Sequence, residues 1–263
     1  MTEEESANLR LLKRAWKARN ELYQELFGDY SYVLPKDYSA PKSEVPGFKR
    51  PLAVESENEG PAAAAPPEPS PDEEITVLAY APNETRPYWM YLTAGLSSPW
   101  FQDKPQEVSG FGCELMLKSA KDARWAVRLL RRLAYYIHSY SGTLSPGVIL
   151  SMEKGAMHPG SESDTNNIFC WYADEAVDAW YDLPSGGFGI FVTVGITEDE
   201  CRYAESIEEY GVWCIQQVLR RTGIFQVTDP TRPTVMNREG IDEILDSVRA
   251  YAENFRASIN PQV

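Results

Sequence analysis

The residues that come closest to a catalytic pattern are four carboxylates set among aromatic side chains in residues 171–182. The carboxylates are Asp174, Glu175, Asp178 and Asp182, and the aromatic residues are Trp171, Tyr172, Trp180 and Tyr181. Two carboxylates beside aromatic platforms could act as acid and nucleophile in a glycosidase. The same cluster could form a solvated acidic surface over a core-facing aromatic side, or hold a basic peptide by charge and stacking. A hydrolase built on Asp174 to Asp182 is therefore the alternative hypothesis, and a binding surface is the first.

Other catalytic and metal chemistries have weaker support. A nucleophilic triad needs a base beside the nucleophile, and the two histidines, His138 and His158, have no neighbouring Ser, Cys or carboxylate in a recognised spacing. The cysteines are far apart and form no C-x-x-C pair: they are Cys113, Cys170, Cys201 and Cys214. We therefore expect buried free thiols in a reducing compartment, no disulfide framework, no catalytic residues, no metal and no cofactor.

Two stretches, 108–117 and 183–195, each pass from turn residues through Gly-Phe-Gly into an apolar run too short for a helix. A phosphate-binding loop would need its glycines to leave a strand and open a helix, whereas both stretches lead into a strand. We therefore expect two neighbouring central strands of one sheet, with glycines as structural turn residues because glycine adopts positive φ without strain. These glycines are Gly110, Gly112, Gly187 and Gly189.

The remaining chain divides by hydrophobic periodicity and composition. An amphipathic helix is expected over 4–26, followed by a Pro/Ala-rich linker. Further strands are expected at 75–80, 88–93, 147–152 and 167–172, and further helices at 121–139, 199–221 and 238–259. Thr197 and Glu200 form a capping box before the second of these helices. The expected organisation is 1–28 as N-terminal helix, 29–73 as loop or linker, 74–235 as the main domain and 236–263 as a C-terminal helix packed on it.

The composition favours a folded acidic protein. The 263 residues are 43% hydrophobic, and 39 acidic against 25 basic residues give a net charge of −14. This balance argues against binding to nucleic acid, whose phosphates need a basic surface, and it would suit a basic protein partner. An acidic surface that only keeps the protein soluble is the simpler explanation. Without an apolar run of about 18 residues or a basic leader, we expect a cytoplasmic chain without membrane contact.

Several motifs resemble the suppressor of fused domain family. They are Tyr88-Trp89-Met90-Tyr91-Leu92-Thr93-Ala94-Gly95-Leu96-Ser97, Ser109-Gly110-Phe111-Gly112-Cys113-Glu114-Leu115, Leu183-Pro184 followed by Phe191-Val192-Thr193-Val194-Gly195-Ile196-Thr197-Glu198, and Val227-Thr228-Asp229-Pro230-Thr231-Arg232-Pro233. The resemblance implies an α+β fold, with a mixed and mostly antiparallel sheet flanked by helices, and a non-catalytic protein-binding function. Animal members restrain transcription factors, and similar bacterial domains are proposed as immunity proteins that neutralise toxins. Cys113 stands where the family usually has an aromatic residue.

The resemblance also indicates where a partner would bind. In the animal protein the loop before the glycine-hinged strand contacts the ligand, and the corresponding loop here is 97–108. Its aromatic residues, Trp100 and Phe101, are candidate partner-binding residues together with Asp174, Glu175 and Asp178. A structural subunit that self-associates through its terminal helices is a third hypothesis, and the oligomeric state stays open.

Overall fold

The computed structural model describes residues 3–33, 75–140, 144–153, 157 and 165–259. The predicted linker lies almost entirely outside the described residues, as does His158. The strands are β1 (Tyr32–Val33), β2 (Thr76–Tyr80), β3 (Trp89–Ala94), β4 (Val108–Ser119), β5 (Ile149–Ser151), β6 (Thr165–Tyr172), β7 (Tyr181–Leu183) and β8 (Gly186–Thr197). The helices are α1 (Glu3–Phe27), α2 (Arg124–Tyr140), α3 (Glu198–Glu205), α4 (Gly211–Arg221) and α5 (Ile241–Ile259), with 3-10 turns η2 (Glu208–Tyr210) and η3 (Val235–Asn237).

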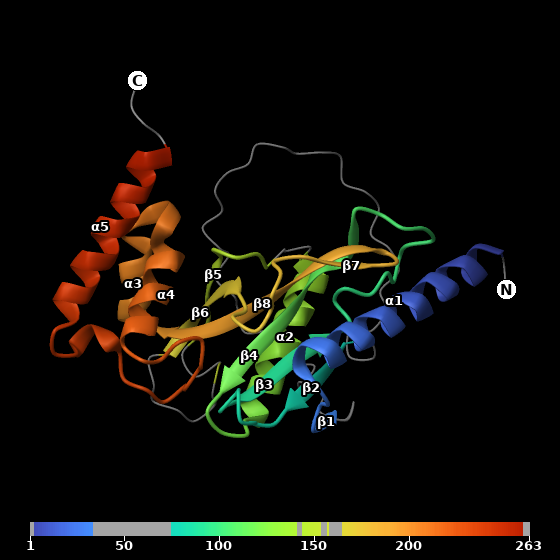
Figure 1. Cartoon of the computed structure of the whole chain (residues 1–263), viewed down its shortest axis with the longest axis horizontal. Helices are drawn as coiled ribbons and strands as arrows, with labels where there is room; N and C mark the ends of the chain where they lie inside the picture. Colours follow the sequence, from blue (N-terminus) through green and yellow to red (C-terminus); the bar gives the residue numbers. More distant parts are fainter. Residues whose placement is uncertain (1–2, 34–74, 141–143, 154–156, 158–164, 260–263) are drawn as a thin grey trace.

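All eight strands form one sheet in the order β1-β2-β3-β4-β8-β6-β5, and β7 pairs with β8 outside this path. The two long strands predicted at the centre, β4 and β8, are neighbours and run parallel. Every other pairing between these strands is antiparallel. The predicted α+β class with a mixed, mostly antiparallel sheet is therefore confirmed (Figure 1).

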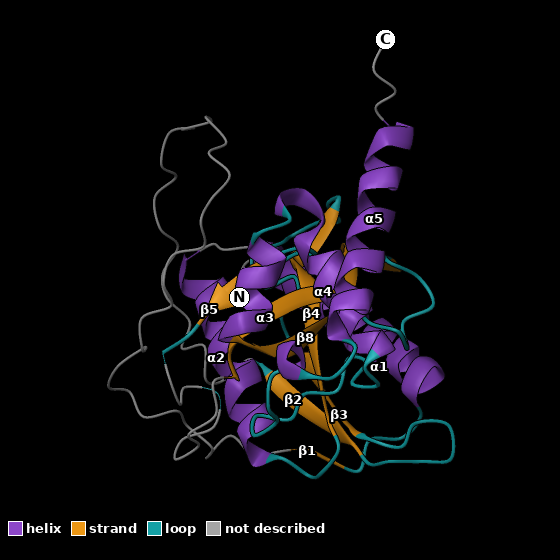
Figure 2. Ribbon diagram, turned by 90° about the vertical axis from the view of Figure 1, so that its left-hand side faces the viewer, coloured by secondary structure: helices purple, strands orange, loops and turns teal. Residues whose placement is uncertain are grey.

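The sheet buries both of its faces because successive side chains point to opposite sides of each strand. One face packs on α2 through residues such as Leu115 and Leu117, while Met116 faces the other side. That second face is covered by α1 near one end and by α3, α4 and α5 near the other (Figure 1). In the turned view the sheet lies between α2 and the helices of the opposite layer (Figure 2). All four cysteines are buried and free, as predicted.

The prediction of one continuous helix over 199–221 was wrong. The helix begins with the predicted capping box at Thr197 and Glu200 but ends at Glu205, and α4 begins at Gly211. A Cβ atom at Gly211 would lie 1.9 Å from the carbonyl oxygen of Ala204, so the two segments approach more closely than any other residue would allow. This close approach breaks the helix at a position that hydrophobic periodicity does not reveal.

The four predicted turn glycines have two different roles. Gly110 and Gly112 have positive φ angles of 57° and 69° and lie in β4 where its register with β8 shifts. Gly187 and Gly189, in contrast, lie inside β8 without a left-handed backbone, so the prediction that they are turn residues is corrected. Side-chain atoms at these two positions would collide with the rings of Trp180 and Phe191, at 1.8 Å and 2.4 Å. Here glycine provides space for aromatic rings.

Candidate functional site

The two aromatic candidates of the 97–108 loop have different environments. Trp100 is half-buried: its indole Nε1 donates to the Gly95 carbonyl oxygen at 2.9 Å, and its ring packs edge-on against Trp16 at 5.6 Å. Phe101 has 57% of its surface exposed. Trp100 therefore holds the loop on the protein, while Phe101 can contact a partner.

Helix α1 fixes this loop through side-chain hydrogen bonds. The Asn8 amide donates to the carbonyl oxygens of Pro99, Trp100 and Gln102 at 2.7–3.3 Å. Trp16 Nε1 donates to Ser98 Oγ at 2.9 Å, and Arg19 Nη1 donates to the same oxygen at 2.9 Å. The polar side of α1 is thus used to position the loop, and the N-terminal helix is docked on the domain.

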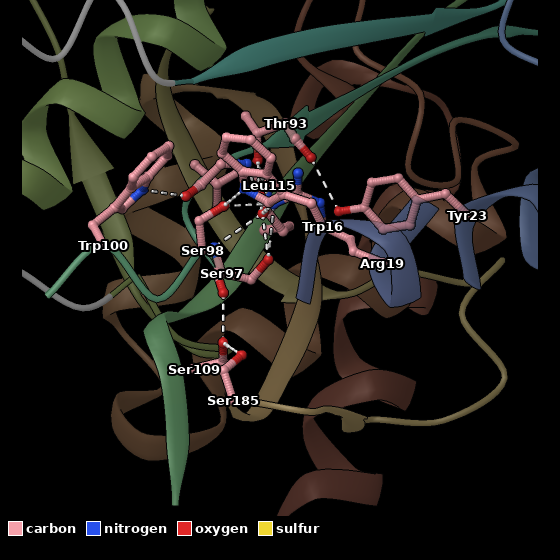
Figure 3. A network of polar contacts seen from close by, with 12 residues as sticks. Trp16, Arg19, Tyr23, Thr93, Ser97, Ser98, Trp100, Ser109, Leu115 and Ser185 are labelled. Atoms are coloured by element: carbon pink, nitrogen blue, oxygen red, sulfur yellow. Dashed lines mark hydrogen bonds and ion pairs between the residues drawn. The ribbon is translucent and has the colours of Figure 1, made fainter. Parts of the chain in front are cut away.

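The centre of this network is Glu114, which the sequence reasoning did not single out as a functional residue. Glu114 is completely buried on β4. Its carboxylate accepts hydrogen bonds from the side chains of Thr93 and Ser97, both at 2.6 Å, from the backbone N–H groups of Gly95 and Ser97, both at 2.9 Å, and from Arg19 at 3.4 Å. Figure 3 shows several of these side chains converging from α1 and the β3–β4 connection. The sequence did contain a signal for this network, namely a Glu within an apolar strand, because a buried charge requires hydrogen-bonding or charged partners.

The predicted residue Glu175 belongs to a second buried network. Its carboxylate forms an ion pair with Lys118 Nζ at 2.5 Å and accepts a hydrogen bond from Tyr88. Lys118 is almost fully buried and also donates to Gln226 Oε1 at 2.7 Å. Burial lowers the pKa of the Lys118 amine, and the charge of Glu175 acts in the opposite direction. Glu175 is therefore held inward.

The four carboxylates of the 171–182 cluster do not converge on one point. Asp174 forms an ion pair with Arg220, and its backbone N–H donates to Gln226, whereas Glu175 pairs with Lys118. Asp178 and Asp182 are exposed. Within the described part of the chain, no group of three or more His, Cys, Asp or Glu residues is placed to hold a metal ion. The arrangement offers exposed negative charge beside two carboxylates that already have cationic partners.

The segment after β6 presents apolar side chains next to these acids. Trp180 lies against Gly187 and Gly112 and has 46% of its surface exposed, while Val177 has 84% exposed. Tyr172, also exposed, packs edge-on against Phe191 at 6.0 Å. We give the name aromatic–acidic surface to five exposed residues between the end of β6 and β7, which are Tyr172, Val177, Asp178, Trp180 and Asp182. Sequence reasoning included Trp180 in a cluster that could hold a basic peptide but did not single it out, since the glycines against which its ring packs lie elsewhere in the chain.

The family model for suppressor of fused protein matches residues 71–233, which is more than half of this chain. The chain belongs to the suppressor of fused family. The resemblance seen in the motifs is thereby confirmed. Among curated proteins, none matches this sequence. No helix in the described residues is both long and apolar enough to pass through a membrane.

Two solved structures, of Drosophila suppressor of fused and of the Sufu–Fu complex, share the fold. The Drosophila suppressor of fused structure is 20% identical, with a TM-score of 0.52, and the match covers 68% of this chain but only 45% of that chain. A structure of the Sufu–Fu complex is 20% identical, with a TM-score of 0.51, covering 66% of this chain and 79% of the other. A homologue from Neisseria gonorrhoeae is 16% identical, with a TM-score of 0.46 and coverages of 63% and 80%.

Proposed function

We propose that this chain is a non-catalytic protein-binding module that contacts its partner through Phe101 and the aromatic–acidic surface. The observation that carries the proposal is the half-exposed ring of Trp180, which packs against Gly187. Asp178 and Asp182, which are close to it in the sequence, are exposed. Exposed aromatic rings with a fixed position are the residues that dominate binding energy at protein interfaces. A family structure is that of the Sufu–Fu complex, so another member binds a protein.

The charge of the surface favours a basic partner. No lysine or arginine occurs in the sequence between residues 155 and 201, a range that contains the whole aromatic–acidic surface. The net charge of −14 adds a long-range field of the same sign. Such a field speeds association with a positively charged protein and weakens as salt increases, because exposed charges are screened beyond a Debye length of about 8 Å at physiological ionic strength.

The more specific role within this proposal is that of a cytoplasmic bacterial immunity protein that neutralises a toxin. An acidic inhibitor suits a basic toxin, as nucleic-acid-degrading toxins must approach phosphates. This role is tested by expressing the chain together with a candidate toxin, which is the product of a gene next to its own. Growth should be rescued by the wild-type chain, and rescue should fail when Trp180 and Asp178 are replaced. Rescue that is indifferent to both replacements would contradict binding through this surface.

Binding itself is tested by affinity capture from the source cells. Trp180→Ala and Asp178→Asn remove an aromatic anchor and a charge from the proposed surface, and both side chains are exposed. Tyr135→Ala is the matched control, because Tyr135 is an exposed aromatic residue of helix α2. The partner should be retained by the control and lost from the Trp180 variant.

The proposal also requires that the chain does not catalyse hydrolysis. A broad screen of glycoside and ester substrates should show no saturable turnover. Turnover that is abolished by Asp174→Asn or Asp178→Asn would overturn the non-catalytic proposal. The ion pairs of Asp174 and Glu175 support the expected result, since carboxylates neutralised by Arg220 and Lys118 are poorly placed to protonate a substrate.

A further inference from the structure

A groove lies between α1 and the sheet, apart from the aromatic–acidic surface. Its volume is about 540 Å³, within the range of small-molecule sites. Most of its lining comes from the inner side of α1, from the chain that follows α1 and from strands β2 and β3. The described lining residues are Trp16, Arg19, Asn20, Tyr23, Gln24, Gly28, Tyr30, Thr76, Leu78, Tyr80, Ala94 and Trp100.

Arg19 is the only charged residue among the described residues that line the groove. Only 6% of its surface is accessible, although the residue contributes to the lining of the groove. Its Nη1 lies 3.4 Å from Glu114, well beyond the roughly 2.7–2.9 Å of a strong charge-assisted bond. The shorter bonds of Glu114 go to Thr93, Ser97 and Gly95. Glu114 is thus largely satisfied without Arg19.

The guanidinium consequently keeps unused donor capacity. Its Nε has no hydrogen-bond partner among the described residues, and its Nη1 uses Ser98 as a good acceptor. An arginine side chain carries five N–H donors arranged in a planar fork that matches a carboxylate. A buried donor that lacks an acceptor is unfavourable, so a ligand acceptor that reaches Arg19 would relieve an existing penalty.

The walls around this cation are aromatic. Trp16 and Trp100, which both line the groove, meet edge-to-face with ring centroids 5.6 Å apart. Tyr80 lines the sheet side, and Tyr30, with 51% of its surface exposed, stands at the opening. Flat rings on several sides favour a flat or apolar ligand body, because aromatic pairs prefer edge-to-face and offset contacts.

We propose that this groove binds a small organic carboxylate with an aromatic or apolar body. The carboxylate accepts hydrogen bonds from Arg19, and the body packs among Trp16, Trp100 and Tyr30. A singly charged carboxylate fits better than a phosphate, since one cation lines the groove and Glu114 lies close behind it. This site is independent of partner binding, so either proposal can fail alone.

The first test compares three ligands of one shape by saturation-transfer NMR titration. Phenylacetate should bind about tenfold tighter than the neutral phenylacetamide, because a hydrogen bond between charged groups adds about 1.4 kcal/mol over a neutral one. The cationic 2-phenylethylammonium should bind more weakly still. Equal binding of the three, or no binding of phenylacetate, would overturn the proposal.

The second test locates the binding with variants that keep the fold. Asn20→Trp places a large ring at the rim of the groove, and Lys13→Trp, at an exposed α1 position outside the lining, is its matched control. Tyr30→Ala removes the exposed wall, with Tyr135→Ala as control on the opposite face of the sheet. Phenylacetate binding should fall at least about tenfold in Asn20→Trp and stay unchanged in both controls.

A conservative change at the cation completes the assignment. Arg19→Lys keeps the positive charge beside Glu114 but loses the planar fork, so phenylacetate should bind less tightly while the amide is unaffected. If Asn20→Trp binds phenylacetate like the wild type, the ligand does not occupy this groove and the inference is wrong.

Discussion

Two charged residues on the same face of β4 show contrasting ways of burying a charge. Glu114 and Lys118 are four residues apart, so their side chains point to the same side of the sheet, and both are almost fully buried. Glu114 lies under α1 and receives hydrogen bonds from hydroxyl and backbone N–H groups. Lys118 lies under the segment after β6 and is neutralised by Glu175, whose side chain keeps 15% of its surface exposed.

The difference indicates what each network contributes. The Glu114 carboxylate is completely buried, and its network fixes α1 and the loop that carries Phe101. The Lys118 network reaches towards the surface and fixes the start of the segment that carries Trp180. Each network thus positions one part of the proposed binding surface, but Glu114 itself is completely buried, whereas the side chain of Glu175 keeps part of its surface exposed.

The largest effect is expected for Glu114→Ala. The change leaves the buried hydroxyls of Thr93 and Ser97 without their acceptor and Arg19 without its counter-charge, and removal of one member of a buried ion pair typically costs about 3–5 kcal/mol. The free energy of unfolding from urea denaturation measures this loss. The double variant Arg19→Met/Glu114→Ala should cost less than the sum of the single changes. A loss of stability below about 1 kcal/mol would mean that the buried donors around Glu114 do not depend on its carboxylate.

A smaller loss of stability than for Glu114→Ala is expected for Lys118→Met. This change leaves Glu175 without its cation, but the carboxylate can turn towards water, so we expect a loss of about 1–3 kcal/mol. Adding Glu175→Gln should recover part of it. The same denaturation series provides the comparison, and a greater loss for Lys118→Met than for Glu114→Ala would reverse the contrast between the two networks.

High pH should weaken both networks through their tyrosines. Burial raises the pKa of Tyr23 and of Tyr88, and the negative charges of Glu114 and Glu175 add to the respective shifts. A raised folded-state pKa gives stability that is fully present below the ordinary tyrosine pKa of 10.0 and is lost as pH rises above it. The lowered pKa of Lys118 has the opposite effect on stability, which rises with pH between that lowered pKa and 10.5.

The free energy of unfolding should therefore fall as pH rises above 10, and the fall should be shallower in Tyr23→Phe. Chemical denaturation at several alkaline pH values measures the slope. Tyr88→Phe should reduce the slope by a similar amount, because the pKa of each tyrosine is raised and each contributes at most one proton to the slope. Equal slopes in the wild type and Tyr23→Phe would show that Tyr23 ionises as easily in the folded protein as in the unfolded chain.

The smallest effect is expected at the surface of α1. Lys17 and Glu21 form an ion pair at 3.7 Å with side chains 78% and 66% exposed. Pairs of this kind contribute about 0.3–0.5 kcal/mol on a helix, so Lys17→Ala should change stability by no more than that. Comparison with Lys118→Met then shows how much of the stability contributed by an ion pair depends on its burial. A loss comparable to that of Lys118→Met would remove the distinction.

Local sequence patterns predicted where the helical segments lie, apart from the break within 199–221, because periodicity and turn residues report on local structure. They also predicted that the two long central strands are neighbours. Residues whose roles depend on contacts across the fold were not predicted. The ring of Trp180 rests on Gly187, and the break at Gly211 depends on the Ala204 carbonyl oxygen. The partners of Glu114 come from α1 and β3, which are distant in sequence. For the candidate site, the sequence shows the acidic stretch but could not tell that Asp174 and Glu175 are paired with Arg220 and Lys118.

The most direct test of protein binding through the aromatic–acidic surface is quantitative affinity capture with the Trp180→Ala/Asp178→Asn variant beside the wild type and Tyr135→Ala. We expect one basic protein to bind the wild type and Tyr135→Ala equally, to dissociate as salt is raised, and to bind the double variant at least about tenfold less. Capture of the same proteins in the same amounts by all three chains would contradict the proposed surface.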